Sequence, residues 1–260
     1  MNAQLPKNAF KEAVRAGRTQ VGLWCSLSNN IAAEVIADAG FDWILVDTEH
    51  APNELPMVLS QLQALVGGTA FPLVRPVWND TVVMKRLLDI GVQNFLVPYV
   101  QTPEEARAAV AATRYPPEGV RGVAVTHRAN RYGRVKDYHK RANEEICLLL
   151  QIETRLALKN LDAIAAVEGV DGLFIGPSDL AAALGHLGQP SHPEVRAAIE
   201  EAFQHIRRSG KAPGILAPIE AEARHWLSQG CVVLAVGSDV GLLARHSEEL
   251  AARFKAGSKG

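Results

Sequence analysis

The fold of this chain is indicated most directly by the stretch CLLLQIE, residues 147–153, together with GLFIGPSD, residues 172–179. Each stretch is an apolar run that leads to a carboxylate, Glu153 in the first and Asp179 in the second. Runs without polar alternation are typical of strands buried on both faces, as in a parallel sheet. The two acids are 26 positions apart, about one strand–helix repeat, so neighbouring parallel strands would carry both carboxylates to the same end of the sheet.

This pair of carboxylates favours a metal site. Two converging acids with few soft ligands nearby suit a hard divalent cation that keeps coordination positions for substrate oxygens. The alternative is that one acid caps a helix and the other is a surface acid, because carboxylates are common helix caps. For either acid taken alone, the sequence leaves both interpretations open.

Composition excludes several classes of protein. A net charge of −1 gives no reason to expect binding to nucleic acid or to an anionic membrane. No apolar run approaches the roughly 20 residues that span a bilayer, and residues 1–11 lack a signal-peptide pattern. Cys25, Cys147 and Cys231 lie in or beside apolar runs, which predicts buried free thiols in a reducing compartment. We therefore expect a cytoplasmic protein.

Strands and helices alternate along the whole chain. Eight apolar strands are predicted, at residues 20–26, 43–47, 71–77, 94–97, 146–152, 172–175, 212–216 and 232–236. Helices are predicted at residues 30–39, 54–65, 155–166, 194–209, 219–229 and 240–255, and after the N-cap residues Asp80 and Thr102. Eight such units without a linker predict a single (β/α)8 TIM barrel over residues 1–260. A doubly wound open sheet is the second choice, and the count of eight argues against it.

The final predicted helix carries an apolar stripe whose partner the sequence does not specify. The stripe could pack on its own barrel or on a neighbouring subunit, and it consists of Val240, Leu242, Leu243, Leu250 and Phe254. The segment 115–143 does not fit the strand–helix repeat and is rich in Arg, Gly and His. Long loops in compact domains are often functional.

A barrel carries its active site at the carboxyl ends of its strands, so the residues there are candidates. Asp47 ends the second strand and could orient the imidazole of His50 as a base. The alternative is that His50 is a loop histidine without a role. Arg75 lies inside an apolar run, where a guanidinium must be paired or bind an anion. No lysine is placed on a strand facing this end, which argues against Schiff-base chemistry.

Five motifs resemble the HpcH/HpaI family of metal-dependent pyruvate aldolases. They cover nearly the whole chain in the family's order and are GFDWILVDTEHAPN (40–53), VRPVWND (74–80), ATRYPP (112–117), QIET (151–154) and VDGLFIGPSDL (170–180). The resemblance implies a (β/α)8 barrel and a divalent metal, Mg, Mn or Co, bound by Glu153 and Asp179. It also implies a homo-oligomer, with a hexamer as the expected form.

The resemblance also assigns roles to the other strand-end residues. It implies that His50 is the catalytic base, that Asp47 is paired with it, and that Arg75 is both catalytic and substrate-binding. The backbone amides of Ser178 and Asp179 would hold the carboxylate of pyruvate. Gln151, at the same strand end as Glu153, completes the expected substrate-binding set.

The implied reaction is retro-aldol cleavage of a 4-hydroxy-2-oxo acid to pyruvate and an aldehyde. The favoured substrate is 4-hydroxy-2-oxo-heptanedioate, which yields succinic semialdehyde in the homoprotocatechuate branch of aromatic catabolism. The alternatives are a sibling aldolase acting on a sugar acid such as 2-dehydro-3-deoxyglucarate, and a non-catalytic barrel that serves as a binding protein. Because a dicarboxylic substrate needs a distant cation, we expect the distal carboxylate to meet Arg121, Arg128 or Arg131.

Overall fold

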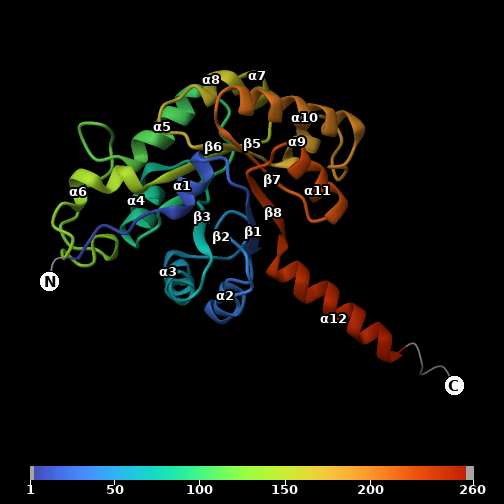
Figure 1. The fold of residues 1–260 in the computed structure, drawn as a ribbon, viewed down its shortest axis with the longest axis horizontal. Coiled ribbons are helices and arrows are strands. Elements are labelled where there is room, and N and C mark those ends of the chain that lie inside the picture. The colour runs from blue at the N-terminus through green and yellow to red at the C-terminus, as the bar shows by residue number, and fades with distance from the viewer. Residues whose placement is uncertain (1–2, 256–260) are drawn as a thin grey trace.

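The protein, described here by a computed structural model over residues 3–255, is built around a closed barrel of eight parallel strands (Figure 1). The strands follow one another in chain order, and β8 closes the barrel by pairing with β1. They are β1 (Gln20–Cys25), β2 (Trp43–Asp47), β3 (Phe71–Arg75), β4 (Asn94–Val97), β5 (Cys147–Ile152), β6 (Gly172–Ile175), β7 (Ala212–Leu216) and β8 (Val233–Ser238). The predicted TIM barrel is confirmed.

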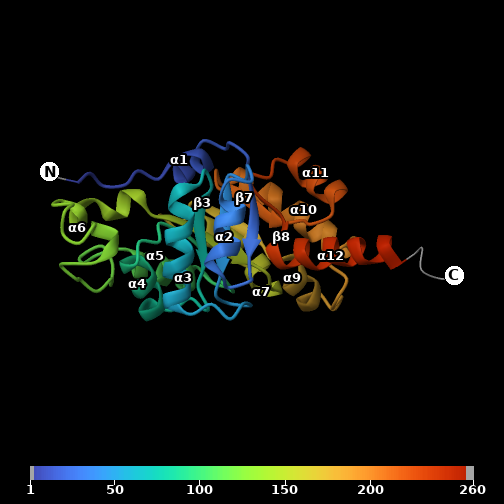
Figure 2. The same ribbon diagram turned by 90° about the horizontal axis from the view of Figure 1, so that it is seen from below.

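Helices surround the barrel, as the view from below shows (Figure 2). Their bounds are α1 (Ala9–Arg15), α2 (Asn30–Ala37), α3 (Leu55–Ala64), α4 (Thr81–Asp89), α5 (Pro103–Thr113), α6 (Tyr138–Arg141), α7 (Arg155–Lys159), α8 (Leu161–Ala165), α9 (Pro177–Ala183), α10 (Pro193–Arg208), α11 (Glu220–Ser228) and α12 (Asp239–Lys255). Three short 3-10 helices cover Leu65–Gly67, Arg128–Asn130 and Ala142–Glu145. The single helix predicted over residues 155–166 is divided at Asn160, and α1 was not predicted.

Two of the predicted helix starts have the expected caps. The Asp80 carboxylate accepts the backbone N–H groups of Val82 and Val83, which would otherwise lack partners at the start of α4. Thr102 and Glu105 form a reciprocal capping box at the start of α5. These local bonds fix where the chain leaves each strand end and turns into its helix.

The inside of the barrel is filled by large side chains that pack against glycines. Trp43 is fully buried, and its Nε1–H donates to the carbonyl of Gln20 over 3.1 Å. A Cβ on Gly22 would overlap the Trp43 ring, and one on Gly214 would overlap Phe174. The polar residues at the ends of β2, β3 and β5 therefore lie above this apolar layer, at the carboxyl end of the barrel.

Helix α12 leaves the barrel and extends away from it (Figure 1). Its base is fixed by the Asp239 carboxylate, which accepts the backbone N–H groups of Ser26 and Leu27 over 2.8 and 3.1 Å. Asp239 is the buried residue of this helix, whereas Leu243 and Leu250 are 61% and 49% exposed. Leu243 and Leu250 of the apolar stripe are therefore not covered by their own barrel.

The cysteine prediction is confirmed, since Cys25, Cys147 and Cys231 are free and buried. Within residues 3–255, none of the helices is both long enough and apolar enough to cross a bilayer.

Candidate active site

Strand alternation carries Glu153 into the mouth of the barrel. In β5, Leu149 packs inside the barrel and Leu150 packs outward against the helices. Because successive side chains of a strand point to opposite faces, Gln151 and Glu153 continue the inward set beyond the last apolar layer. Both side chains are buried, with Glu153 only 2% exposed.

The same alternation brings Asp47 and Arg75 together. They are register partners at the ends of β2 and β3, and each lies two positions after an inward-facing leucine of its strand, Leu45 or Leu73. Arg75 donates from Nε to Asp47 Oδ1 over 2.9 Å and from Nη2 to Asp47 Oδ2 over 2.7 Å. This bidentate pair is buried and holds the guanidinium plane in one orientation. The need of Arg75 for a partner, predicted from its apolar surroundings, is thus confirmed.

Two further residues complete the surroundings of Arg75, and the sequence did not single out either of them. Glu49 Oε2 lies 2.9 Å from Arg75 Nη1, and the Trp24 ring centroid lies 5.5 Å from Arg75 Cζ. Burial alone would lower the pKa of Arg75, but the hydrogen bonds and charge of Asp47, together with the charge of Glu49, raise it. Glu49 follows the last residue of β2 by two positions, and this nearness to the strand end was the sequence signal that could have identified it.

Glu153 lies in a setting that disfavours its charge. The backbone N–H of Tyr99 donates to its Oε1 over 2.8 Å, and the Gln151 amide donates to its Oε2. Burial raises the pKa of Glu153 to about 7; those two hydrogen bonds oppose the rise, and the charges of Asp179 and Glu49 add to it. The charges of Asp179 and Glu49 thus disfavour the charged form of Glu153.

Asp179 and Ser178 stand in the first turn of α9, directly after β6. Both are exposed, and the N-cap Gly176 offers no side-chain acceptor to the first amides of this helix. A Cβ on Gly176 would overlap Glu153 Oε2. Glycine at this position therefore lets the turn pass close to Glu153 and brings Asp179 beside it.

These residues fit a hard divalent cation. The negative charges of Glu49, Glu153 and Asp179 disfavour one another, and Arg75, the cation that acts on Glu49 and Glu153, is already engaged by Asp47 and Glu49. Gln151 Oε1, beside Glu153, is a buried oxygen without a hydrogen-bond donor among the described residues. A cation bound by Glu153 and Asp179 would offset the repulsion, and an all-oxygen ligand set suits Mg²⁺ or Mn²⁺.

His50 lies at this end of the barrel, but the structure changes its expected pairing. Its side chain is 65% exposed, and its Nε2 lies 3.7 Å from Glu49 Oε2. Asp47 accepts the backbone N–H groups of Glu49 and His50 over 3.0 and 3.4 Å, while its carboxylate binds Arg75. Asp47 therefore fixes the backbone of His50 and orients Arg75; the prediction that it orients the imidazole is corrected.

The arginines of the segment 115–143 lie elsewhere. Arg121 is fully buried, with its Cζ 4.3 Å from the Tyr115 ring centroid and its Nη2 3.4 Å from Asp89. Arg128 donates to the carbonyl of Ile90 over 2.6 Å, just before the amino end of β4. Arg131 lines the same recess as Arg128, at the amino ends of the strands. The prediction that these arginines bind the distal carboxylate of the substrate is therefore not met within a single chain, where they lie away from Glu153 and Asp179.

Comparison with known proteins identifies the family of this chain. The profile of the HpcH/HpaI aldolase/citrate lyase family matches residues 20–246. The chain belongs to this family. A solved structure of an HpcH/HpaI aldolase/citrate lyase family protein from Burkholderia cenocepacia superposes with a TM-score of 0.93 at 38% identity, and the match covers 96% of this chain and 100% of that one.

Two relatives with named activities are closer in sequence. A pyruvate aldolase of Rhizobium etli is 60% identical over 251 residues, which is 96% of this chain and 99% of that protein. A 4-hydroxy-2-oxo-heptane-1,7-dioate aldolase of Klebsiella pneumoniae is 58% identical over 248 residues, covering 95% and 94%. The family assignment made from the five sequence motifs is thus confirmed, and these HpcH/HpaI relatives are aldolases.

Proposed function

We propose that this HpcH/HpaI protein is a divalent-metal-dependent aldolase that cleaves 4-hydroxy-2-oxo-heptanedioate to pyruvate and succinic semialdehyde. The observation that carries the proposal is the buried Arg75 held by Asp47 and Glu49 beside Glu153 and Asp179. The substrate is supported by the name of the Klebsiella pneumoniae relative. The name of the Rhizobium etli relative supports the chemistry at the pyruvate end without specifying the aldehyde.

A divalent ion, Mg²⁺, Mn²⁺ or Co²⁺, held by Glu153 and Asp179 would supply positive charge beside the 2-oxo group of the substrate. Arg75 donates hydrogen bonds to the oxygen of that 2-oxo group, because Asp47 fixes the plane of its guanidinium group at the end of β3, beside Glu153. Preorganised donors of this kind stabilise the charge that develops on the oxygen as the bond breaks. The uncapped amides of Ser178 and Asp179 receive the substrate carboxylate.

His50 takes the proton of the 4-hydroxyl group. The C3–C4 bond then breaks, C4 becomes the aldehyde carbon, and the bonding electron pair passes to the three-carbon fragment as pyruvate enolate. Protonation of C3 gives pyruvate. The exposed imidazole of His50 can exchange its proton with solvent between cycles, as a general base requires.

Imine chemistry is not proposed. Among the described residues, the eight strands carry no lysine: Lys85 lies on α4, Lys159 on α7, and Lys211 precedes β7. Borohydride added with pyruvate is expected to leave the protein mass unchanged, and EDTA is expected to stop turnover. A trapped pyruvyl adduct would overturn the mechanism.

The function is tested by measuring pyruvate release from 4-hydroxy-2-oxo-heptanedioate and from 2-dehydro-3-deoxyglucarate with Mg²⁺, Mn²⁺ and Co²⁺. We expect the higher kcat/KM for the first substrate. A preference for the second would support the sibling activity instead. Absence of pyruvate from both substrates with all three ions would support the non-catalytic alternative.

We also propose a homo-oligomer, with a hexamer as the expected form. Support comes from α12, which presents Leu242 and Leu243 to solvent at 43% and 61% exposure while it extends from the barrel. Apolar faces of this kind are typical of subunit contacts. Light scattering at micromolar concentration should give a multiple of the chain mass, and a monomer mass would contradict the proposal.

The three buried free thiols support a cytoplasmic location.

A further inference from the structure

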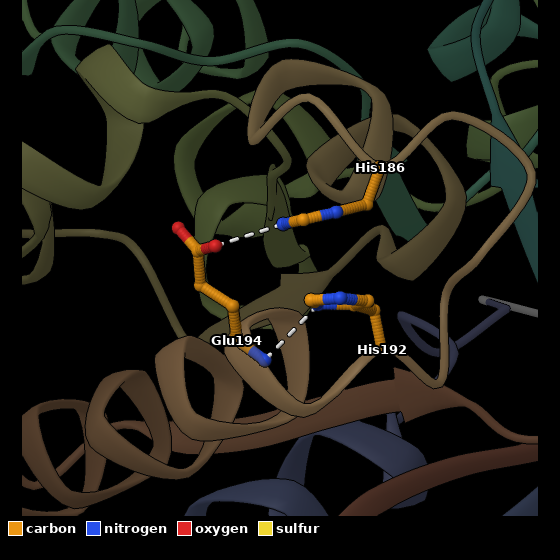
Figure 3. A group of neighbouring side chains, drawn as sticks. All are labelled: His186, His192 and Glu194. Carbon is orange, nitrogen blue, oxygen red and sulfur yellow. Dashed lines mark hydrogen bonds and ion pairs between the residues drawn. The ribbon is translucent and has the colours of Figure 1, made fainter.

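A second cluster of ligand-type side chains lies outside the barrel mouth, on the loop that joins α9 to α10. His186 stands near the start of this loop, and His192 and Glu194 stand where α10 begins (Figure 3). One possible ligand atom from each of the three lies within 4.8 Å of the others. The mechanism proposed above uses none of these residues.

The side chains already contact one another. His186 Nε2 lies 2.8 Å from Glu194 Oε2, and the two imidazole rings are stacked with centroids 3.6 Å apart and an angle of 15° between their planes. His192 Nδ1 accepts the backbone N–H of Glu194 over 3.3 Å.

The backbone holds the two histidines at fixed positions. Gln189 donates its N–H to the carbonyl of His186 over 2.9 Å, and His192 donates to the carbonyl of Gln189 over 3.0 Å. Gly185 and Gly188 supply the positive φ angles, 91° and 76°, that this tight path needs. Ligands on a closed loop lose less conformational entropy when an ion binds than ligands on separate flexible segments.

We propose that His186, His192 and Glu194 bind a divalent transition-metal ion such as Zn²⁺, at a site separate from Glu153 and Asp179. Two imidazoles and one carboxylate form the donor set of many zinc sites, in which water or a further ligand takes the fourth position. Imidazole nitrogen favours Zn²⁺, Cu²⁺ and Ni²⁺ over Mg²⁺. The two regions therefore differ in the ions they select.

Binding requires one movement of the side chains. An ion lies in the plane of each imidazole that binds it, so the parallel rings must turn toward each other. Zn–N bonds are about 2.0–2.1 Å, so the ligand atoms must also come closer than their present separation. His192 and His186 are only partly buried and Glu194 is exposed, which leaves room for this rotation. The ion would then join the loop to the first turn of α10.

The inference is tested by equilibrium dialysis of Zn²⁺ against the full-length protein in excess Mg²⁺. His186→Phe keeps a ring to stack on His192 but removes a ligand, and His192→Asn keeps a good N-cap while removing the imidazole. His246→Ala is the matched control, because His246 is paired with Glu249 on α12, where its ring nitrogen lies 3.2 Å from the acid.

We expect the wild type and His246→Ala each to bind one equivalent of Zn²⁺. In His186→Phe and in His192→Asn, the affinity for this Zn²⁺ should be lower by roughly tenfold or more. Loss of an outer partner of a metal ligand already costs roughly 10–100-fold, so loss of a ligand should cost at least as much. Aldolase activity with Mg²⁺ should be unchanged in His186→Phe, which separates this test from that of the proposed function. Equal zinc binding in the wild type and either histidine variant would overturn the inference.

Discussion

The carboxyl ends of the strands and the segment 115–143 both gather charged side chains, yet they use them differently. At the strand ends, Glu153 and Arg75 face one buried space because strand alternation carries them there. In the segment 115–143, Arg121 is enclosed by Tyr115 and Tyr138, and Arg128 binds a backbone carbonyl. A charge placed by a strand is available for chemistry, whereas a charge placed by an irregular segment can be used to hold that segment in place.

The strongest test of the comparison is Glu153→Gln, which removes the buried charge with little change in size. We expect metal affinity and activity to be lost while the barrel persists, because the apolar core does not depend on this acid. Mn²⁺ binding and pyruvate release should be measured together with the circular dichroism spectrum. Unchanged metal affinity in a folded variant would remove Glu153 from the metal site.

The second test removes the proposed base. His50→Ala should lose roughly 10²–10⁴ in kcat, typical for a positioned base, while metal and pyruvate still bind. Asp47→Asn is the informative companion, since Asp47 binds Arg75 over 2.9 and 2.7 Å and reaches His50 only through its backbone N–H. Its effect should therefore resemble that of a change at Arg75. Near-normal turnover of His50→Ala would mean that another group takes the proton.

Arg75→Lys should lower kcat by roughly 10²–10³, the usual cost of removing a preorganised donor at a developing oxyanion. An ammonium cannot reproduce the bidentate bond to Asp47, and it has no fixed plane. Exchange of the methyl protons of pyruvate with solvent passes through the same enolate without an aldehyde, so it should fall as well. If cleavage fell while exchange kept the wild-type rate, Arg75 would act at the aldehyde end instead.

These tests concern residues that the sequence could place because strands have a regular period. The eight apolar runs predicted the barrel, and the strand ends predicted Asp47, Arg75, Gln151 and Glu153 at its mouth. The strand period could not predict two contacts of the site. The side-chain partner of Asp47 depends on the register of β2 against β3, and Glu49 Oε2 meets Arg75 through a turn with no period.

The segment 115–143 shows the same limit more clearly. Its arginines were expected at the substrate because a dicarboxylate needs a cation. That requirement says which kind of residue is needed, but not where in the fold the residue lies. The structure places Arg128 and Arg131 beside the amino ends of the strands, which no periodic pattern in the segment indicates. The direction of α12 was open for a similar reason, since an apolar stripe does not identify its partner.

A smaller effect is expected in the stability of the metal-free protein. Burial raises the pKa of Glu153 from 4.5 to about 7, so the folded protein keeps a proton that the unfolded chain releases between these pH values. The free energy of unfolding should therefore decrease as pH rises through this window, by about 3 kcal/mol from this group. Urea unfolding in EDTA at several pH values measures it. Glu153→Gln should remove the slope, and a wild-type slope in that variant would assign the effect to another acid.

The smallest effect is expected at Arg128, which lies in the segment 115–143. Arg128→Ala removes the hydrogen bond to the carbonyl of Ile90, so the free energy of unfolding should fall by about 1–2 kcal/mol. KM should change by less than about twofold, for a dicarboxylic substrate and for one with an uncharged tail alike, because Arg128 lies at the opposite end of its own barrel. Arg107→Ala is a suitable control, since Arg107 is 59% exposed and pairs with Glu104 on the surface. A rise in KM confined to the dicarboxylic substrate would contradict this prediction. It would mean that Arg128 acts in the site of a second copy of the chain.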